Sequence, residues 1–388
     1  MELINREQCT GCMACFQVCP MKCISIEEDD LGHKYPAINH LKCIECGKCN
    51  YVCPESNTLV SNTSKKAYAA WSLDSKDRLS SASGGAASVF YQTAIEQEMY
   101  ISGAIYDNNF EVKHIVSNNI EDISKFKQSK YVYSNSDDIY NKIKILLDDG
   151  KQVLFISLPC KIAGLLSYLG KNYPRLITID IVCHGTPSYK MLKEHIFNKS
   201  SLTNLDNLSF RNNNVFMFQL TGNNKKIYRK INILDEYLAA FLKSVNYRES
   251  CYQCKYAKNE RISDITICDF WGLGKNIPFD HPYTGSISAV LINTENGKLF
   301  FDKNKTKLFF EERQVKEAIE GNSQLNHPTI KPLCFNEFNN LYRKYGLDKS
   351  SKILFRKERL TYKVDYYYKS FVLNLKNLIK LIFKIRRK

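Results

Sequence analysis

CTGCMACFQVCP, residues 9–20, and CIECGKCNYVCP, residues 43–54, carry one cysteine spacing, C-x2-C-x2-C-x3-C followed by proline. Each cysteine of the second copy lies 34 residues after its counterpart in the first. A repeat of this kind predicts two similar halves that face each other around a pseudo-twofold axis. We therefore expect residues 1–60 to form one small domain around the two copies.

The spacing is typical of a ferredoxin-like module with two [4Fe-4S] clusters, in which the fourth cysteine of each run ligates the cluster of the other half. We expect the first cluster on Cys9, Cys12, Cys15 and Cys53. We expect the second on Cys43, Cys46, Cys49 and Cys19. Zinc also binds paired C-x2-C units, but it does not suit three such cysteines in a row with a trailing Cys-Pro. Cys23 lies outside both runs and is expected to pack as a small apolar residue.

Length and composition are those of a globular protein with two or three domains: 388 residues, 44% hydrophobic and 24% charged. The net charge of +15 is concentrated after residue 342, where fifteen Lys and Arg face three acids. The body is close to neutral, so we expect no nucleic-acid partner. No apolar signal core precedes Cys9 and no stretch reaches about 18 apolar residues. We therefore expect a cytoplasmic protein.

Residues 346–388 are expected to form a basic helical tail. Apolar residues recur there at helical spacing, namely Phe371, Leu375, Leu378, Ile382 and Phe383. Lysines and arginines lie between and after them. Two interpretations remain open: a helix lying on the inner face of an anionic membrane as a peripheral contact, or a helix docked on the body with a solvated basic face.

The polar residues 56–66 are expected to link the first domain to a second one, whose two parts are expected at 65–150 and 151–345. In the first part, the small-residue loop Ser80 to Gly85 precedes an apolar-periodic run, 86–95. A helix that begins after such a loop presents free N–H groups and a positive dipole end to an anion such as phosphate. A helix cap without any ligand is the open alternative.

The second part alternates strands and helices as an α/β domain does. The runs 153–156 and 177–182 read as strands with a helix between them, and the first ends near Cys160, the second at Cys183. Parallel strands would bring both cysteines to one sheet edge. Cys251 and Cys254 supply a C-x2-C pair that needs partners, so we expect these four to bind a third [4Fe-4S] cluster. The alternative for Cys160 and Cys183 is the ordinary burial of small residues at strand ends. We prefer burial in the core for Cys268, and Cys334 has no motif around it.

Taken together, these residues resemble the beta subunits of coenzyme F420-reducing hydrogenases and F420-dependent dehydrogenases. The resemblance covers most of residues 1 to about 275. The segments that carry it are Ser83-Gly84-Gly85, Gln128-Ser-Lys-Tyr-Val132, Leu158-Pro-Cys160, Cys183-His-Gly185, Cys251-x2-Cys254 and Asp264-Ile-Thr-x-x-Asp269-Phe-Trp-Gly272. Cys268 departs from the family, which more often has Gly at that position. The same architecture appears in chlorophyll-type reductases and in bacterial proteins associated with surface polysaccharide synthesis.

The resemblance implies FAD in the α/β domain. Ser83, Gly84 and Gly85 would approach the flavin phosphates, and Lys130 and Tyr131 would line the flavin or substrate site. The expected fold is thus an α+β ferredoxin-like dicluster domain, an α/β flavin-binding domain and the basic tail.

A flavin also connects one-electron clusters to a hydride-exchanging substrate. We expect an oxidoreductase that exchanges electrons with ferredoxin or another redox protein. Its small-molecule substrate would be coenzyme F420 or an unidentified metabolite, such as one of surface polysaccharide synthesis. The alternative is an electron-relay subunit without a substrate of its own. His184 is a candidate proton donor, or a hydrogen-bonding partner beside Cys183.

Overall fold

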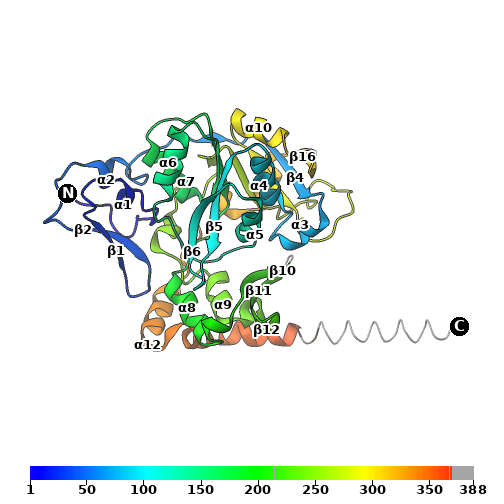
Figure 1. Ribbon diagram of the computed structural model, residues 1–388. Coiled ribbons are helices and arrows are strands. Elements are labelled where there is room, and N and C mark those ends of the chain that lie inside the picture. Colours follow the sequence, from blue (N-terminus) through cyan, green and yellow to red (C-terminus); the bar gives the residue numbers. More distant parts are fainter. Residues whose placement is uncertain (213–214, 367, 369–388) are drawn as a thin grey trace.

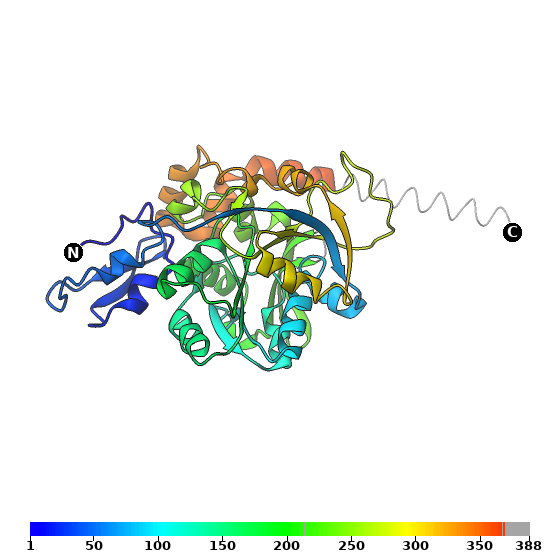
Figure 2. The same cartoon turned by 90° about the horizontal axis from the view of Figure 1, so that it is seen from above.

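The computed structural model describes residues 1–212, 215–366 and 368. A small N-terminal module lies at one end of the molecule, beside a large sheet flanked by helices (Figures 1 and 2). A layer of helices and short strands lies beneath this sheet in Figure 1. The chain passes from the module to the sheet and then in and out of the lower layer.

The N-terminal module is built from α1 (Ala14–Val18), the antiparallel hairpin of β1 (Ile24–Glu28) and β2 (Lys34–Ile38), and α2 (Lys48–Tyr51). These elements make an α+β unit, as expected. The hairpin tip lies against the lower layer, because a Cβ on Gly32 would lie 2.3 Å from the Cβ of Lys190. Gly32 has φ +79°, so this tight approach and the turn both favour glycine.

Among the described residues, nine strands form one mixed sheet. In spatial order they are β16 (Leu308–Arg313), β4 (Lys66–Ser72), β15 (Ser288–Ile292), β14 (Ile265–Asp269), β9 (Leu176–Ile181), β8 (Val153–Ser157), β5 (Tyr100–Tyr106), β6 (Val112–Ser117) and β7 (Ser134–Asn135). The expected parallel pair is confirmed as β8 and β9, with Val153 opposite Leu176. β14 continues the parallel set beside β9. On the side of the sheet beyond β14, the strands β15, β4 and β16 each run antiparallel to the strand beside them.

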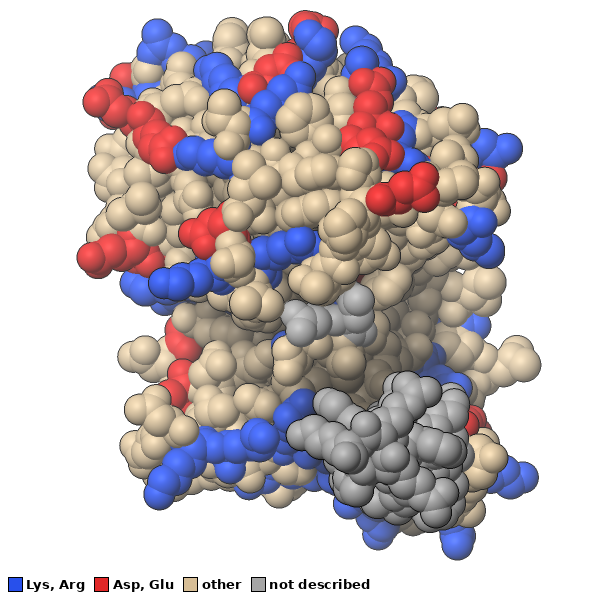
Figure 3. All heavy atoms as spheres, turned by 90° about the vertical axis from the view of Figure 1, so that its right-hand side faces the viewer, with Lys and Arg blue, Asp and Glu red and all other residues tan. Residues whose placement is uncertain are grey.

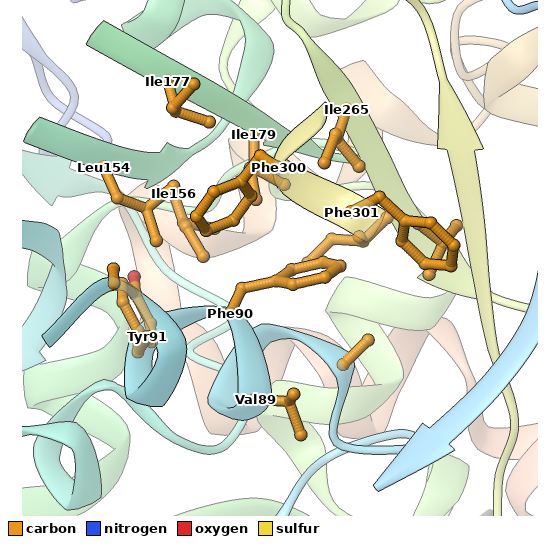
Figure 4. Packing of buried hydrophobic residues seen from close by; sticks show 14 of the residues in the cluster. Val89, Phe90, Tyr91, Leu154, Ile156, Ile177, Ile179, Ile265, Phe300 and Phe301 are labelled. Atoms are coloured by element: carbon orange, nitrogen blue, oxygen red, sulfur yellow. The ribbon is translucent and has the colours of Figure 1, made fainter. Parts of the chain in front are cut away.

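Helices cover both faces of this sheet because the strands are apolar on both sides. One face packs against α4 (Ala86–Glu96) and α10 (Glu295–Asp302), the other against α6 (Ile139–Asp148) and α7 (Pro159–Leu169). On the first face, Phe90 lies next to Phe300 and Phe301, with isoleucines of the strands around them (Figure 4). α11 (Val315–Glu320) packs near the β4 edge. The helix that was expected over 86–95 is thus confirmed as α4.

The shorter elements are α3 (Ser75–Ser80), α5 (Ile123–Phe126), η1 (Ile120–Asp122), η2 (Leu202–Asn204), η3 (Asn232–Leu234), η4 (Glu249–Gln253) and η5 (Ser323–Leu325), the η elements being 3-10 turns. Residues 56–66 are not only a linker. Within them, β3 (Asn62–Thr63) pairs with β13 (Glu260–Arg261), far along the chain. Two residues carry no periodic pattern, so nothing in the sequence indicated this pairing.

The lower layer contains an antiparallel sheet of β10 (Asn207–Asn212), β11 (Val215–Gly222) and β12 (Lys225–Ile231). It packs with α8 (Tyr189–Phe197), α9 (Glu236–Leu242) and α12 (Phe335–Leu354) around an aromatic core. Phe210, Phe218 and Tyr237 lie at its centre with ring centroids 5.4 to 5.9 Å apart. No separate sheet was predicted for this region.

The tail boundary that we expected at 345/346 falls inside α12, at a kink. Gly346 has φ +73° and ψ 176°, and a Cβ there would lie 2.2 Å from Oε1 of Glu194. Beyond the kink, Leu347 and Ser351 are fully buried, so this part belongs to the lower layer. The apolar residues 371–383 lie outside the described residues. Among the described helices, none is long and apolar enough to cross a membrane.

A buried ionic network joins α8, α9 and the second half of α12. Nε2 of His195 lies 3.0 Å from Oδ2 of Asp235, and its Nδ1 lies 2.5 Å from Oδ1 of Asp348. Burial alone would lower the pKa of His195, but the two carboxylates outweigh it and raise that pKa to about 9. Lys199 also lies 2.6 Å from Asp348, which helps to hold the pKa of this carboxyl at about 2. His195 is therefore an imidazolium at neutral pH.

This network predicts that stability depends on pH in a defined direction. The pKa of His195 is about 9 in the folded chain and about 6.5 when unfolded, so its contribution is complete below about pH 6.5 and is lost as pH rises through about 9. The shift corresponds to roughly 3 kcal/mol. We expect the difference in thermal midpoint between wild type and His195→Gln to be larger at about pH 6 than at about pH 10. Equal differences would mean that His195 is neutral in the native state.

Candidate functional site

Four N-terminal thiols converge beside α1. Burial, together with the nearby thiols of Cys9 and Cys53, raises the pKa of Cys12 to about 12. Burial and the thiols of Cys12, Cys9 and Cys53 also raise the pKa of Cys15. The structure thus brings together the four cysteines expected to share a cluster. A thiolate in such surroundings needs a cation beside it, which suits an iron-sulfur core.

The second set of thiols lies at the outer end of the module. Cys19, Cys43, Cys46 and Cys49 line one recess, and Cys23 lines it too. The Sγ atoms of Cys19 and Cys23 are 3.3 Å apart. Cys23 packs against Ile24 and Cys49, so it fills space next to the second set. This position agrees with the packing role that we expected for Cys23, whereas its contact with Cys19 was not predicted.

Four further thiols meet where the sheet ends. Cys160 lies in the first turn of α7, directly after β8, and Cys183 follows β9. Cys251 and Cys254 lie in and just after η4. Burial, together with the thiols of Cys254 and Cys251, raises the pKa of Cys160 to about 12. Burial likewise raises the pKa of Cys183, and the other three thiols add to this effect. Four half-buried cysteines from three segments form a donor set that suits a soft metal or an iron-sulfur cluster.

The loop of the first thiol set is bonded directly to side chains that neighbour the third set. Lys161, next to Cys160, donates from Nζ to the carbonyl oxygen of Gly11 at 2.7 Å. Arg248 donates to the carbonyl oxygen of Cys9 at 3.2 Å and to that of Lys34 at 2.6 Å. The carbonyl of Arg248 in turn accepts the N–H of Cys251 at 3.0 Å. Both basic side chains are buried.

Further bonds connect the same two sets. The hydroxyl of Tyr133 donates to Gly11 O at 2.7 Å, and that of Tyr140 donates to Cys12 O at 2.9 Å. Tyr256, two residues after Cys254, donates to Glu55, two residues after Cys53, at 2.9 Å. We call this region of contacts the junction; it consists of Lys161, Arg248, Tyr133, Tyr140 and the Tyr256–Glu55 pair. The first thiol set therefore adjoins the third, and the second set lies on the outer side.

The Ser83-Gly84-Gly85 loop lies where β4 and β15 meet the start of α4. A Cβ on Gly84 would lie 2.4 Å from Ala70 O and 2.7 Å from Ser288 N, so no larger residue fits. The buried carboxylate of Asp77 accepts from the hydroxyl of Ser88, in the first turn of α4, at 2.5 Å. Lys127 lies 2.6 Å from this carboxylate. The positive end of α4 thus already faces an acid, which no sequence pattern had indicated.

The segment with Lys130 and Tyr131 lies close to this loop, but the side chains of these two residues contact other parts of the chain. Lys127 and Gln128 donate to the hydroxyl and carbonyl of Ser80, at 2.8 and 2.5 Å. Lys130 instead donates to the carbonyl of Lys127 at 2.9 Å, and burial lowers its pKa to about 7. The ring of Tyr131 stacks on Phe241 with centroids 4.5 Å apart. Lys127 and Gln128, rather than Lys130, therefore contact Ser80, at the end of α3 and three residues before this loop.

An ion pair with unused polar atoms links the sheet to the lower layer. Arg211 of β10, 5% exposed, donates to Oδ2 of Asp269 at the end of β14 at 2.6 Å. Nε and Nη2 of Arg211 and Oδ1 of Asp269 have no partner among the described residues. His184 is exposed; surrounding protein lowers the pKa of its imidazole, and Asp269 opposes this. On the face opposite the N-terminal module, the surface is hollowed between sheet and lower layer (Figure 3).

Comparison with known proteins gives the family. Residues 150–318 match the family model for the C terminus of the coenzyme F420 hydrogenase/dehydrogenase beta subunit, and residues 8–57 match the 4Fe-4S dicluster domain. Residues 150–318 belong to the coenzyme F420 hydrogenase/dehydrogenase beta-subunit family, and a 4Fe-4S dicluster domain precedes them. The chain is therefore an iron-sulfur electron-transfer protein related to oxidoreductase subunits. The expected resemblance is thereby confirmed.

Several relatives of this chain are informative. The F subunit of the F(420)H(2) dehydrogenase of Methanosarcina mazei is 20% identical over 320 residues, which are 78% of this chain and 83% of the relative. The VorC subunit of the ketoisovalerate oxidoreductase of Methanothermobacter marburgensis is 34% identical over 59 residues, 15% of this chain and 75% of the relative. A solved chain of the F420-reducing [NiFe] hydrogenase complex from Methanosarcina barkeri is 18% identical with a TM-score of 0.46, covering 76% and 93% of the two chains.

Proposed function

We propose that this chain is an iron-sulfur flavoprotein oxidoreductase of the cytoplasm. It moves electrons between three [4Fe-4S] clusters and, through FAD, a substrate that exchanges a hydride. The observation that carries the proposal is the junction, in which residues beside Cys160 and Cys251 bond to the loop of Cys9 and Gly11. Through these bonds the first and third sets lie side by side, which is the arrangement that electron transfer between them requires.

The residues proposed to hold the clusters form three sets. The first set is Cys9, Cys12, Cys15 and Cys53. The second is Cys19, Cys43, Cys46 and Cys49. The third is Cys160, Cys183, Cys251 and Cys254. The clusters supply one-electron transfer, and a bound flavin supplies the exchange between single electrons and a hydride. Lys161 and Arg248 keep positive charge between the first and third sets.

The flavin is proposed to lie along the Ser83-Gly84-Gly85 loop. Asp77 already faces the start of α4, so a phosphate there would take over donors that now bond to the protein, namely Lys127 from Asp77 and Gln128 from Ser80. Arg211 and Asp269 offer unpaired polar atoms for the reacting end of the substrate or flavin. Tyr131 lies within electrostatic reach of Arg211. His184 is the proposed proton donor, because its side chain is exposed and lies next to Cys183 of the third set.

Replacing Gly84 tests the flavin site. We expect Gly84→Ala to reduce the FAD retained after anaerobic reconstitution several-fold, because the new Cβ would press on Ala70 O and Ser288 N and displace the loop. The iron content should stay unchanged. Gly170→Ala is the control for general destabilisation: a Cβ at Gly170 meets nothing within 4 Å, but its φ of +66° strains any other residue. Equal FAD content in all three proteins would remove the loop from the proposed site, and no FAD in the wild type would overturn the flavin itself.

The substrate is proposed to be coenzyme F420 or a metabolite such as one of surface polysaccharide synthesis. Purified full-length chain, reduced by dithionite or by reduced ferredoxin, should convert one of these. A second function has its own support, because the relatives from Methanosarcina mazei and Methanothermobacter marburgensis are both named as subunits of larger oxidoreductases. In that case the chain is an electron relay. The relay would be favoured if the flavin is reduced but no candidate substrate is converted unless a partner enzyme is added.

A further inference from the structure

Large apolar side chains surround the second thiol set without being covered by the rest of the chain. Leu41 is 99% exposed, Tyr51 73%, Ile44 60% and Met21 47%. Met21 and Ile44 line the same recess as Cys43 and Cys49, and Cys46 at its rim is itself exposed. By contrast, Cys9 and Cys12 of the first set are buried. The second set is therefore the one with direct access from outside.

Unpaired positive charge accompanies this apolar surface. Lys22 and Lys42 are exposed on the loops of this surface, and Lys48 is exposed at the start of α2. Within residues 1–212 and 215–366 none of the three forms an ion pair, whereas Glu45 is paired with the N-terminal ammonium at 3.0 Å. The acid on these loops is thus largely neutralised and the lysines are not. We call the surface of Met21, Leu41, Ile44, Tyr51 and these three lysines the Cys46 face.

The position of the Cys46 face suits an external contact. The module lies at one end of the molecule in both ribbon views (Figures 1 and 2), and its other side is occupied by the junction. A small apolar patch with a charged rim is typical of short-lived redox complexes, which bury less than about 1,200 Å². A permanent subunit interface is larger and more apolar.

We propose that the Cys46 face docks an acidic one-electron carrier protein of the ferredoxin class. This rests on the proposed function insofar as the second thiol set holds a cluster. The carrier's acidic side chains meet Lys22, Lys42 and Lys48, and its own redox centre faces Cys46. One electron leaves the reduced carrier and enters the chain at the second set, so that the carrier is oxidised and the chain reduced; no bond or proton changes. The lysines mainly raise the association rate, and the apolar side chains exclude water at the contact.

Binding of an acidic 2[4Fe-4S] ferredoxin to the anaerobically reconstituted full chain tests this proposal. We measure the dissociation constant by calorimetry at low and high salt, without turnover. Lys42→Glu/Lys48→Glu should weaken binding by about 10-fold or more at low salt and abolish most of the salt dependence. Leu41→Asp should weaken binding at both salt concentrations. Iron content and visible absorbance should match those of the wild type.

Lys76→Glu/Lys275→Glu is the matched control, because both lysines are exposed, form no ion pair among the described residues and lie in the sheet part. It should bind as the wild type does. Equal weakening by both double variants, or unchanged binding of Lys42→Glu/Lys48→Glu, would overturn the Cys46 face as the docking site. A protein that covers this face and remains bound through purification would overturn the transient carrier in favour of a permanent subunit. Failure of the flavin or substrate assays leaves this binding result unaffected, so the two proposals fail separately.

Discussion

Replacing Cys251 and Cys254 together by alanine is expected to remove about a third of the iron, from about twelve atoms per chain to about eight. Both thiols lie with Cys160 and Cys183 in the third set, so two ligands cannot hold a cluster there. The eight N-terminal cysteines are unchanged, and their clusters should keep their spectra. Reduction of the flavin by ferredoxin should also stop. In our proposal, electrons from the N-terminal clusters reach the flavin only through the third cluster.

Cys268→Ala/Cys334→Ala is the control for this experiment. It also removes two thiols of the same domain, but neither lies in a thiol set: Cys268 packs beside Phe270 and Cys334 beside the lower-layer core. Iron and flavin reduction should both stay at the wild-type level. An unchanged iron count in Cys251→Ala/Cys254→Ala would instead show that the four cysteines are structural.

Arg248→Gln is expected to destabilise the junction strongly. Arg248 is 1% exposed, bonds to the carbonyls of Cys9 and Lys34, and lies 4.4 Å from the ring centroid of Tyr35. Without the guanidinium, two buried carbonyl oxygens lose their hydrogen-bond donors, which lowers the free energy of unfolding by roughly 3–5 kcal/mol. Visible absorbance should be lost at a lower temperature than in the wild type. The reduction potential of one cluster should also fall, because a fixed positive charge favours the reduced, more negative state.

Two further variants separate charge from packing. Arg248→Lys keeps the charge and should restore the potential, although it restores only part of the thermal stability because an ammonium lacks the planar fork. Arg229→Gln removes a charge from the exposed surface of β12 and should change neither property. If the potential of Arg248→Gln equals that of the wild type, Arg248 has a structural role only.

Local spacing made the cysteine chemistry predictable. The two C-x2-C-x2-C-x3-C runs, the strands that end near Cys160 and at Cys183, and the C-x2-C at Cys251 each lie within a few residues. Period and spacing can therefore identify them. The parallel pairing of β8 and β9 followed from the same local pattern.

The contacts that join these pieces could not be predicted in this way. Arg248 bonds to Cys9 across 239 residues, and Lys161 bonds to Gly11 across 150. A single buried Arg or Lys has no periodicity, and its partners are carbonyls that any residue supplies. Asp77 at the start of α4 was missed for a related reason, because it reaches Ser88 from a separate helix. The antiparallel edge of the sheet was missed because β4 and β15 lie more than two hundred residues apart.

The docked second half of α12 decides where the chain can be shortened. Beyond Gly346, the hydroxyl of Ser351 donates to the carbonyl of Glu236 at 2.8 Å, and Arg359 donates to Glu236 at 2.7 Å. Asn232 still reaches the hydroxyl of Tyr362 at 2.6 Å. A premature stop codon between 346 and 355 would therefore expose the aromatic core of the lower layer and produce an aggregating protein, whereas a stop after Ser370 leaves every one of these contacts in place.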